Sequence, residues 1–230
     1  MSPTTPKLYQ YAVCPFCKKI EAILKYKKIP YEAVEVHPLN KKEIKFSESY
    51  KKVPIYLDQH GNQVNDSTPI MRHIDGEHPN TNVFDETPLE EKWVKWADEV
   101  LVRALPPIVY NTLPNSLKAF HYITKEGKFS FFQRYLIKYS GALVMMMVAK
   151  KSSKKYNIPD PSGHFTNCLN EWAEALGDGP YLNRENPNGA DLAIYGVLRS
   201  IHQLPAFHYV EKNPKVSQWY KRLENLVYNS

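Results

Sequence analysis

Apolar and polar residues alternate over short stretches in the first third of the chain, which indicates strands separated by helices. The predicted strands are Leu8–Val13, Tyr31–Val36, Val53–Leu57 and Gln63–Val64. The predicted helices are Lys18–Lys28, a weaker segment over Lys41–Tyr50, and one that begins at Asp66-Ser67. This order predicts a small mixed sheet of about four strands, because a strand–helix–strand crossover joins parallel strands.

The spacing of apolar residues is helical in the rest of the chain, where no strand pattern recurs. The expected helices are Leu89–Val109, Asn115–Lys125, Phe129–Ser152, Ser162–Leu176, Ala190–His202 and Lys215–Tyr228, with Pro and Gly between most of them, as at Pro106-Pro107. Between the two patterns, Glu77–Pro88 is rich in Pro, Asn, Asp and Thr, which is typical of a linker. We therefore expect an α/β domain over residues 1–76, a linker over 77–88 and an all-helical domain over 89–230.

The composition is that of a folded protein rather than a disordered or disulfide-stapled chain. Of 230 residues, 43% are hydrophobic and 13% are aromatic, which provides ample material for a packed core. Three cysteines are too few, and odd in number, for a disulfide framework, so we expect a reducing, cytoplasmic setting. The first residues are polar and show no secretory signal.

The net charge of +6 admits two interpretations. A basic balance can indicate binding to nucleic acid or to an anionic membrane surface. The lysines are dispersed, few arginines accompany them, and no nucleic-acid-binding motif is found. This favours an ordinary solvated lysine surface and no nucleic-acid partner.

The longest apolar run, Gly141–Ala149, is shorter than the ~20 residues that cross a bilayer, so no integral membrane segment is expected. We interpret the run as part of a buried helix. Contact with a membrane surface is the lesser alternative, favoured only slightly by the flanking Lys150 and Lys151.

The residues with the clearest chemical meaning are Cys14 and Cys17, which lie between the first strand and its helix. A cysteine at a helix N-terminus faces unpaired backbone N–H groups and the positive end of the helix dipole, so the pKa of its thiol is lowered. Pro15 suits the first helical turn, where its missing N–H would not be used. Cys14 would attack an electrophile such as a disulfide, and Cys17 would resolve the mixed disulfide.

Two alternatives compete with this redox interpretation. The cysteines could form half of a zinc site, but there is no second Cys-x-x-Cys and Cys168 lies far away and alone, so no metal site is expected. They could also be structural residues of the core. A Cys-x-x-Cys that follows a strand in a βαβ pattern favours the redox function over both alternatives.

Two further segments are candidates for binding a peptide-like ligand. In Lys52–Ile55 a proline lies within an apparent strand, which fits a cis Val53–Pro54 bond and a Val53 backbone that pairs with an extended peptide. A plain edge-strand proline is the alternative. At the helix that begins at Asp66-Ser67, the free N–H groups and the Ser67 hydroxyl could bind a carboxylate, while Asp66 could hold an ammonium group. An ordinary helix cap is the alternative there.

These three segments, in this order, resemble the glutathione-binding thioredoxin-like domain of glutaredoxins and glutathione transferases, and the helical half resembles the transferase helical domain. Within this superfamily the chain is similar to the microsomal prostaglandin E synthase type 2 family, over most of its length from Leu8 to Trp219. The matching segments are Leu8–Tyr11, Cys14–Cys17, Ile29–Tyr31, Val34–Val36, Glu43–Phe46, Lys52–Ile55, Trp96–Asp98, Tyr122-Ile123, Glu126–Phe129 and Ala190–Arg199. The family's N-terminal hydrophobic anchor is not found, and Glu77–Pro88 is shorter than its counterpart in the animal protein.

The resemblance implies a glutathione-dependent enzyme in which Cys14 holds or activates the glutathione sulfur and Tyr11 stands beside it as a hydrogen-bond donor. Tyr11 as a core aromatic residue is the alternative. The implied glutathione-binding residues are Cys14, Phe16, Lys52, Val53, Pro54, Asp66 and Ser67. The resemblance also implies a homodimer, haem as a further candidate ligand, and a structural role for Asp191 as the cap of a buried helix.

Two functions remain open. In the first, a thiolate from Cys14 or from bound glutathione attacks a small hydrophobic electrophile, either a disulfide or the O–O bond of an endoperoxide, and Tyr11 assists the leaving oxygen. The dithiol route of disulfide exchange needs Cys17, whereas isomerisation tolerates its loss. In the second, the chain is a glutathione–haem or iron–sulfur binding protein without turnover.

A scaffold that contacts partner proteins through the lysine face of Lys18–Lys28 is a third interpretation, which the Cys-x-x-Cys argues against. Substrate specificity would come from the helical half. Its residues Tyr110, Phe120 and Met145–Met147 are candidates equally for the core and for a substrate pocket.

Overall fold

The computed structural model describes residues 4–38, 40–126, 131–182 and 184–228, with the backbone alone at positions 120–126, 131–138 and 140. The packing of Cα atoms divides the chain into two compact units. The first is built from the chain up to Val94, Pro187–Ser200 and the segment from Arg222 onward, and the second from Lys95–Asn186 and Ile201–Lys221. The domain boundaries expected at residues 76 and 88 stay a prediction.

The first unit contains a four-stranded mixed sheet with the strand order β2-β1-β3-β4. The strands are β1 (Lys7–Gln10), β2 (Glu32–Glu35), β3 (Ile55–Leu57) and β4 (Gln63–Asn65). Strand β1 pairs in parallel with β2 and antiparallel with β3, and β3 pairs antiparallel with β4. The predicted strands and the parallel crossover are thus confirmed.

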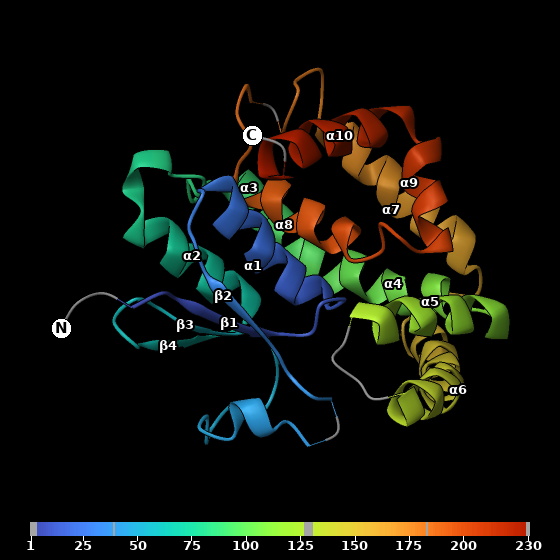
Figure 1. Ribbon diagram of the computed structural model, residues 1–230. Coiled ribbons are helices and arrows are strands. Elements are labelled where there is room, and N and C mark those ends of the chain that lie inside the picture. The colour runs from blue at the N-terminus through green and yellow to red at the C-terminus, as the bar shows by residue number, and fades with distance from the viewer. Residues whose placement is uncertain (1–3, 39, 127–130, 183, 229–230) are drawn as a thin grey trace. The chain divides into compact units, whose positions relative to one another are not determined.

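Helices α1 (Pro15–Tyr26) and α2 (Ser67–Glu77) lie on one face of this sheet, and α1 also packs against α8 (Gly189–Arg199) (Figure 1). Gly196 of α8 permits this close approach, because a Cβ atom there would lie 2.6 Å from the backbone N and Cα of Lys19. The helix that begins at Cys14 is therefore held in place from two sides.

The start of α8 is fixed by a capping box between Asn188 and Asp191. The Asn188 side chain accepts the backbone N–H of Asp191 at 3.0 Å, and the Asp191 carboxylate accepts that of Asn188 at 3.1 Å. Asp191 is fully buried. The prediction that it is a folding residue is confirmed, because both ends of this reciprocal pair satisfy helix-terminal donors.

A small cluster of Val36, Ile44 and Ile55 forms a further core in the first unit. The helix predicted over Lys41–Tyr50 is wrong, since only the short 3-10 turn η1 (Lys42–Ile44) forms there. Ile44 is buried and Phe46 is 47% exposed, so the segment has no continuous apolar face that could stabilise a longer helix.

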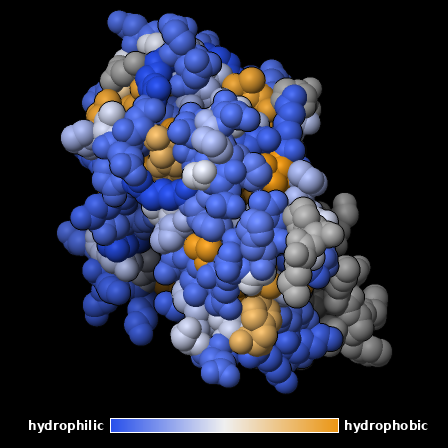
Figure 2. Space-filling view, turned by 90° about the vertical axis from the view of Figure 1, so that its left-hand side faces the viewer, coloured by the Kyte–Doolittle hydropathy of each residue, from blue (hydrophilic) through white to orange (hydrophobic). Residues whose placement is uncertain are grey.

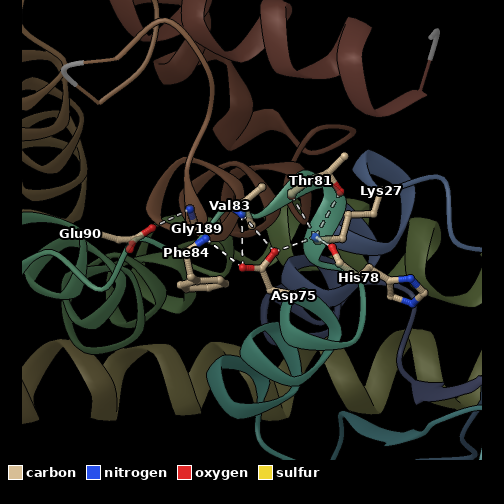
Figure 3. Close-up of polar contacts among 8 residues, drawn as sticks. All are labelled: Lys27, Asp75, His78, Thr81, Val83, Phe84, Glu90 and Gly189. Carbon is tan, nitrogen blue, oxygen red and sulfur yellow. Dashed lines mark hydrogen bonds and ion pairs between the residues drawn. The ribbon is translucent and has the colours of Figure 1, made fainter.

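A buried ion pair joins the ends of α1 and α2 (Figure 3). The ammonium group of Lys27 lies 2.7 Å from the Asp75 carboxylate, and the Lys27 side chain is fully buried. The same ammonium group donates to the carbonyl oxygens of His78 and Thr81 at 2.9 Å. These hydrogen bonds replace the water that the Lys27 ammonium group loses on burial.

Two carboxylates continue this network toward α8 (Figure 3). Asp75 accepts the backbone N–H groups of Val83 and Phe84, each at 3.0 Å. Glu90 accepts the backbone N–H of Gly189 at 2.9 Å. The segment predicted as a linker thus contains the 3-10 turn η2 (Pro79–Thr81) and backbone held by buried acids.

The remaining elements are helical, as predicted. They are α3 (Pro88–Trp96), the π-helical turn η3 (Ala97–Leu101), α4 (Val102–Val109), α5 (Leu113–Glu126), α6 (Phe131–Lys155), α7 (Pro161–Ala175), the 3-10 turn η4 (Pro205–Phe207), α9 (His208–Lys212) and α10 (Pro214–Tyr228). Pro106 and Pro107, expected between helices, lie inside the last turns of α4. In the second unit the rings of Trp172 and Trp219 meet edge to face, with their centroids 5.3 Å apart.

The prediction that Gly141–Ala149 is buried is wrong for its large side chains. This run lies in α6, where Ala142 and Ala149 are buried but Leu143 is 50% and Met147 55% exposed. Helix α6 packs against α4 and α5. Small residues face these neighbours and large apolar residues face solvent, an orientation that the apolar run by itself does not reveal. No helix within the described residues is long and apolar enough to cross a membrane.

Candidate active site

Cys14 is the N-cap residue of α1. Its backbone is extended (φ −75°, ψ 123°), and Pro15 takes up the first helical position. The Cys14 N–H donates to the carbonyl oxygen of Tyr11 at 2.9 Å, and the Cys14 carbonyl accepts the N–H of Lys18 at 2.9 Å. The Cys14 side chain itself forms no capping hydrogen bond with the first turn of α1. The first free amides of α1 are therefore available to the Cys14 sulfur.

The pKa values of Cys14 and Cys17 move in opposite directions. The hydrogen bond from the Cys17 thiol lowers the pKa of Cys14 against the effect of burial, and the backbone N–H groups of Cys17 and Phe16 lower it further. Burial raises the pKa of Cys17 well above its ordinary value, and its bond to Cys14 adds to this. Cys17 is 1% exposed, whereas Cys14 is partly exposed. The geometry thus provides one thiol with a lowered pKa and a second thiol that stabilises negative charge on the first.

Tyr11 precedes the cysteines in the turn after β1. Burial raises the pKa of the Tyr11 hydroxyl, and negative charge at Cys14 raises it further. The hydroxyl therefore stays protonated and remains a donor near neutral pH. The Tyr11 ring also packs against the cluster of Val36, Ile44 and Ile55, so both of its predicted functions have a structural basis.

Glu35 is a residue of this site that sequence reasoning missed. Its carboxylate accepts the backbone N–H of Ala12 at 3.0 Å and so holds the turn between Tyr11 and Cys14. The Glu35 charge opposes the lowering of the Cys14 pKa. Parallel pairing places Glu35 opposite Gln10, at the edge where β1 ends, and this pairing is the signal that could have identified it.

The predicted cis peptide bond between Val53 and Pro54 is confirmed. It precedes β3, and the Val53 side chain packs against the same small cluster as Tyr11. Outside the sheet ladders, the backbone of Val53 makes no hydrogen bond with the residues that the structure describes. Lys52 is exposed, and no hydrogen bond or ion pair in the described part of the chain ties it to the other candidates.

Asp66 and Ser67 begin α2, as predicted. The Asp66 carboxylate does not cap the helix; it accepts a hydrogen bond from the Tyr50 hydroxyl at 2.7 Å. Burial raises the pKa of Tyr50, and the bond to Asp66 adds to the shift. Ser67 is buried, at 5% exposure. The ordinary-cap alternative does not account for the Asp66 side chain, which Tyr50 orients instead.

The candidates for a substrate pocket have different surroundings in the second unit. Tyr110 lines an open cavity of about 420 Å³, and burial raises the pKa of its hydroxyl to about 12. Met145 and Met146 are half-buried, and Met147 is exposed. The Phe120 side chain lies outside the described part of the structure. Their function in substrate binding stays a prediction.

Comparison with known proteins agrees with this geometry. Residues 8–82 match the family model of the glutathione S-transferase N-terminal domain. Prostaglandin E synthase 2 of Mus musculus is 33% identical to the chain over an alignment of 273 residues, which covers 96% of this chain and 70% of the mouse protein. The chain belongs to the prostaglandin E synthase 2 family.

Solved structures show that this family member has the glutathione transferase fold. Glutathione S-transferase III in its apo form aligns with a TM-score of 0.67 and 15% identity, over 96% of this chain and 92% of that one. A glutathione transferase of Methylobacillus flagellatus with glutathione bound aligns with a TM-score of 0.61 and 15% identity, over 96% and 95%. The predicted fold class is confirmed, and the prostaglandin E synthase 2 family member is a glutathione-dependent enzyme.

Proposed function

We propose that the chain binds glutathione at the start of α1 and uses Cys14 as the thiolate that reacts with, or activates, the glutathione sulfur. The observation that carries this proposal is the position of Cys14 at the N-cap of α1, where the Cys17 thiol and the first backbone N–H groups of the helix lower the pKa of Cys14, while burial raises the pKa of Cys17. Val53, Asp66 and Ser67 would hold the tripeptide, since they offer backbone, carboxylate and helix N-terminal groups suited to its peptide, ammonium and carboxylate parts.

The first reaction is thiol–disulfide exchange with glutathione. The Cys14 thiolate attacks one sulfur of a disulfide, the S–S bond breaks, and the leaving thiolate takes a proton from solvent. With a glutathione mixed disulfide as substrate, the Cys14 sulfur then carries glutathione. The thiolate of a second glutathione attacks this glutathione sulfur, releases oxidised glutathione and regenerates the Cys14 thiolate, so one free glutathione is consumed for each mixed disulfide reduced. Burial raises the pKa of Cys17 and so disfavours its attack on this intermediate, which makes resolution by a second glutathione the expected route.

The second reaction is endoperoxide isomerisation, which the name of the mouse relative supports. A thiolate attacks one peroxide oxygen, the O–O bond breaks, and the electron pair goes to the other oxygen, which takes a proton. Tyr11 would assist this oxygen as a hydrogen-bond donor. Loss of a proton from the carbon that carries the sulfur-bound oxygen then expels the thiolate and forms a carbonyl group. The reaction is an isomerisation and needs no further oxidant or reductant.

The experiment is retention on immobilised glutathione together with turnover of a glutathione mixed disulfide and of an endoperoxide. The wild-type chain should be retained and should turn over at least one substrate. Ser67→Ala should weaken retention, and Cys14→Ser should abolish turnover. A wild-type chain that is not retained, or a Cys14→Ser variant as active as wild type, contradicts the proposal.

Haem or iron–sulfur binding without turnover is the alternative, and only the thiols of Cys14 and Cys17 support it. Among the described residues no cluster of three or more metal-ligating side chains is found, so Cys14 or the glutathione thiolate would carry the iron. The visible absorption spectrum of the purified chain, before and after addition of haem and glutathione, tests it. Homodimerisation stays a prediction from the family resemblance, to be tested by light scattering.

A further inference from the structure

The solvent-facing side of α6 is unlike the rest of the described surface. Hydrophobic residues scattered singly are ordinary on a protein surface, and Figure 2 shows such scatter on one face of this molecule. In α6 they are contiguous instead: Tyr139, Leu143, Val144, Met147 and Val148 are all between 43% and 55% exposed. We call these five residues the α6 apolar face.

Exposed lysines continue this face along the same helix. Leu143, Met147, Lys150 and Lys154 are spaced by four, three and four residues, which places them in one row. A second row of the same spacing ends in Lys151 and Lys155, and all four lysines are exposed. A row of exposed apolar residues that lysines continue offers an anionic lipid surface both apolar contact and positive charge.

The charge of the whole chain is concentrated on this segment. Residues 127–159 contain seven Lys and Arg and no Asp or Glu. The chain has 30 basic and 24 acidic residues, so the remainder has 23 and 24, a net charge of −1. The expectation of evenly dispersed lysines is therefore wrong, because the entire positive excess lies within and beside α6.

Within the described residues these lysines have no acidic partner. Lys150 and Lys154 line the cavity of about 420 Å³ with Ser153 and Asn157, and none of the lining residues in the described part of the chain is acidic. The carboxylate of Asp160, which follows in sequence, accepts the backbone N–H of Ser162 at 3.0 Å. The two ammonium groups thus border an open cavity that can admit an anionic group.

From these observations we propose that α6 binds peripherally to an anionic membrane, with the α6 apolar face at the level of the acyl chains and the lysines at the lipid phosphates and carboxylates. A second copy of this chain explains the apolar residues less well. Its own segment 127–159 has no acidic side chain that could pair with the lysines. Tyr139, whose ring is apolar and whose hydroxyl is polar, suits the boundary between acyl chains and headgroups.

The test is co-sedimentation of the full chain with phosphatidylcholine vesicles that contain, or lack, phosphatidylserine. The chain should bind the vesicles with phosphatidylserine and not the neutral ones, and added salt should weaken the binding. Lys150→Gln with Lys154→Gln should weaken binding by about 30-fold. Lys212→Gln with Lys221→Gln, which lowers the net charge equally at exposed positions outside α6, should change it by less than about twofold.

Leu143→Ala with Met147→Ala tests the apolar part and retains helix-forming residues. This variant should bind at least about tenfold more weakly, with an unchanged circular dichroism spectrum and melting temperature. The proposal is overturned if the wild type binds neither vesicle, if it binds both equally, or if the two lysine pairs have the same effect. A doubled mass in light scattering that Leu143→Ala with Met147→Ala abolishes, without vesicle binding, would assign the face to self-association.

Discussion

The thiols of Cys14 and Cys17 differ because one lies at the start of a helix and the other inside the protein. The hydrogen bond that Cys17 donates, together with the free amides of α1, stabilises negative charge on Cys14. Burial disfavours the same charge on Cys17. A short motif thus produces two thiols of unequal acidity, which is the property that thiol catalysis requires.

Serine substitutions at the two positions should therefore have unequal effects. Cys14→Ser should lose turnover by at least ~100-fold, because it removes the nucleophile. Cys17→Ser should retain turnover when glutathione is in excess, since a second glutathione resolves the mixed disulfide. Steady-state rates of both variants check this. Loss of all turnover in Cys17→Ser would show that the dithiol route is obligatory.

Sequence reasoning identified the cysteines and the Asp66-Ser67 pair because their signals are local. It missed Glu35 and Tyr50, whose contacts join positions 23 and 16 residues apart. Glu35 lies in the family-matching segment Val34–Val36, but that match assigns it no function at the site, and Tyr50 belongs to no motif. Only the pairing of β1 with β2, and the fold of the segment before Val53, bring them to the site.

The position of α1 depends on α8, which follows it by more than a hundred residues in the chain. The contact is close because Gly196 has no side chain. Local patterns predicted the bounds of most strands and helices to within a few residues. They could not predict that Lys41–Tyr50 forms a single 3-10 turn or that α6 turns large apolar residues outward. Both outcomes depend on which side of each segment packs against another element.

Gly196→Ala should destabilise the chain by about 1–3 kcal/mol, because the added Cβ would meet the backbone of α1. Gly76→Ala is the matched control in α2, where a Cβ meets nothing within 4 Å. It should leave stability unchanged or raise it by up to ~1 kcal/mol. Urea denaturation of both variants measures the difference, and equal effects would contradict the assigned contact.

Lys27→Met should cost about 3–5 kcal/mol, because it leaves the buried Asp75 carboxylate without its cation. The control is Lys28→Met at the neighbouring, exposed position, which should have little effect. The free energy of unfolding from chemical denaturation is the readout. A neutral Lys27→Met variant would show that the backbone N–H groups of Val83 and Phe84 are sufficient for Asp75.

For the chain as a whole, composition alone was enough to predict a folded protein, since apolar and aromatic content are global quantities. The division into two parts was predicted from the change between strand and helix patterns instead. The net charge of +6 did not reveal the basic segment 127–159, because the rest of the chain has nearly equal numbers of basic and acidic residues. Burial of thiol and tyrosine side chains in both units also makes stability depend on pH.

The chain should lose stability as the pH rises above about 9. Burial raises the pKa of Cys168 from 9.0 to about 11, and those of Tyr56 and Tyr110 from 10.0 to about 12. At pH values between the ordinary and the raised pKa of each group, the unfolded chain has lost a proton that the folded chain retains. The free energy of unfolding therefore falls with rising pH. Urea denaturation at pH values from neutral to 11 measures this. A stability that stays constant or rises over the interval would contradict it.

The pH dependence of alkylation by iodoacetamide at each cysteine, read by mass spectrometry with and without glutathione, tests the assignment of Cys14 most directly. Cys14 should react first, with a midpoint below the ordinary thiol value of 9.0, and bound glutathione should slow the reaction. Cys17 should react only at higher pH, if at all. A midpoint for Cys14 at or above 9.0, or no protection by glutathione, would contradict the assignment of Cys14 as the thiolate of a glutathione site.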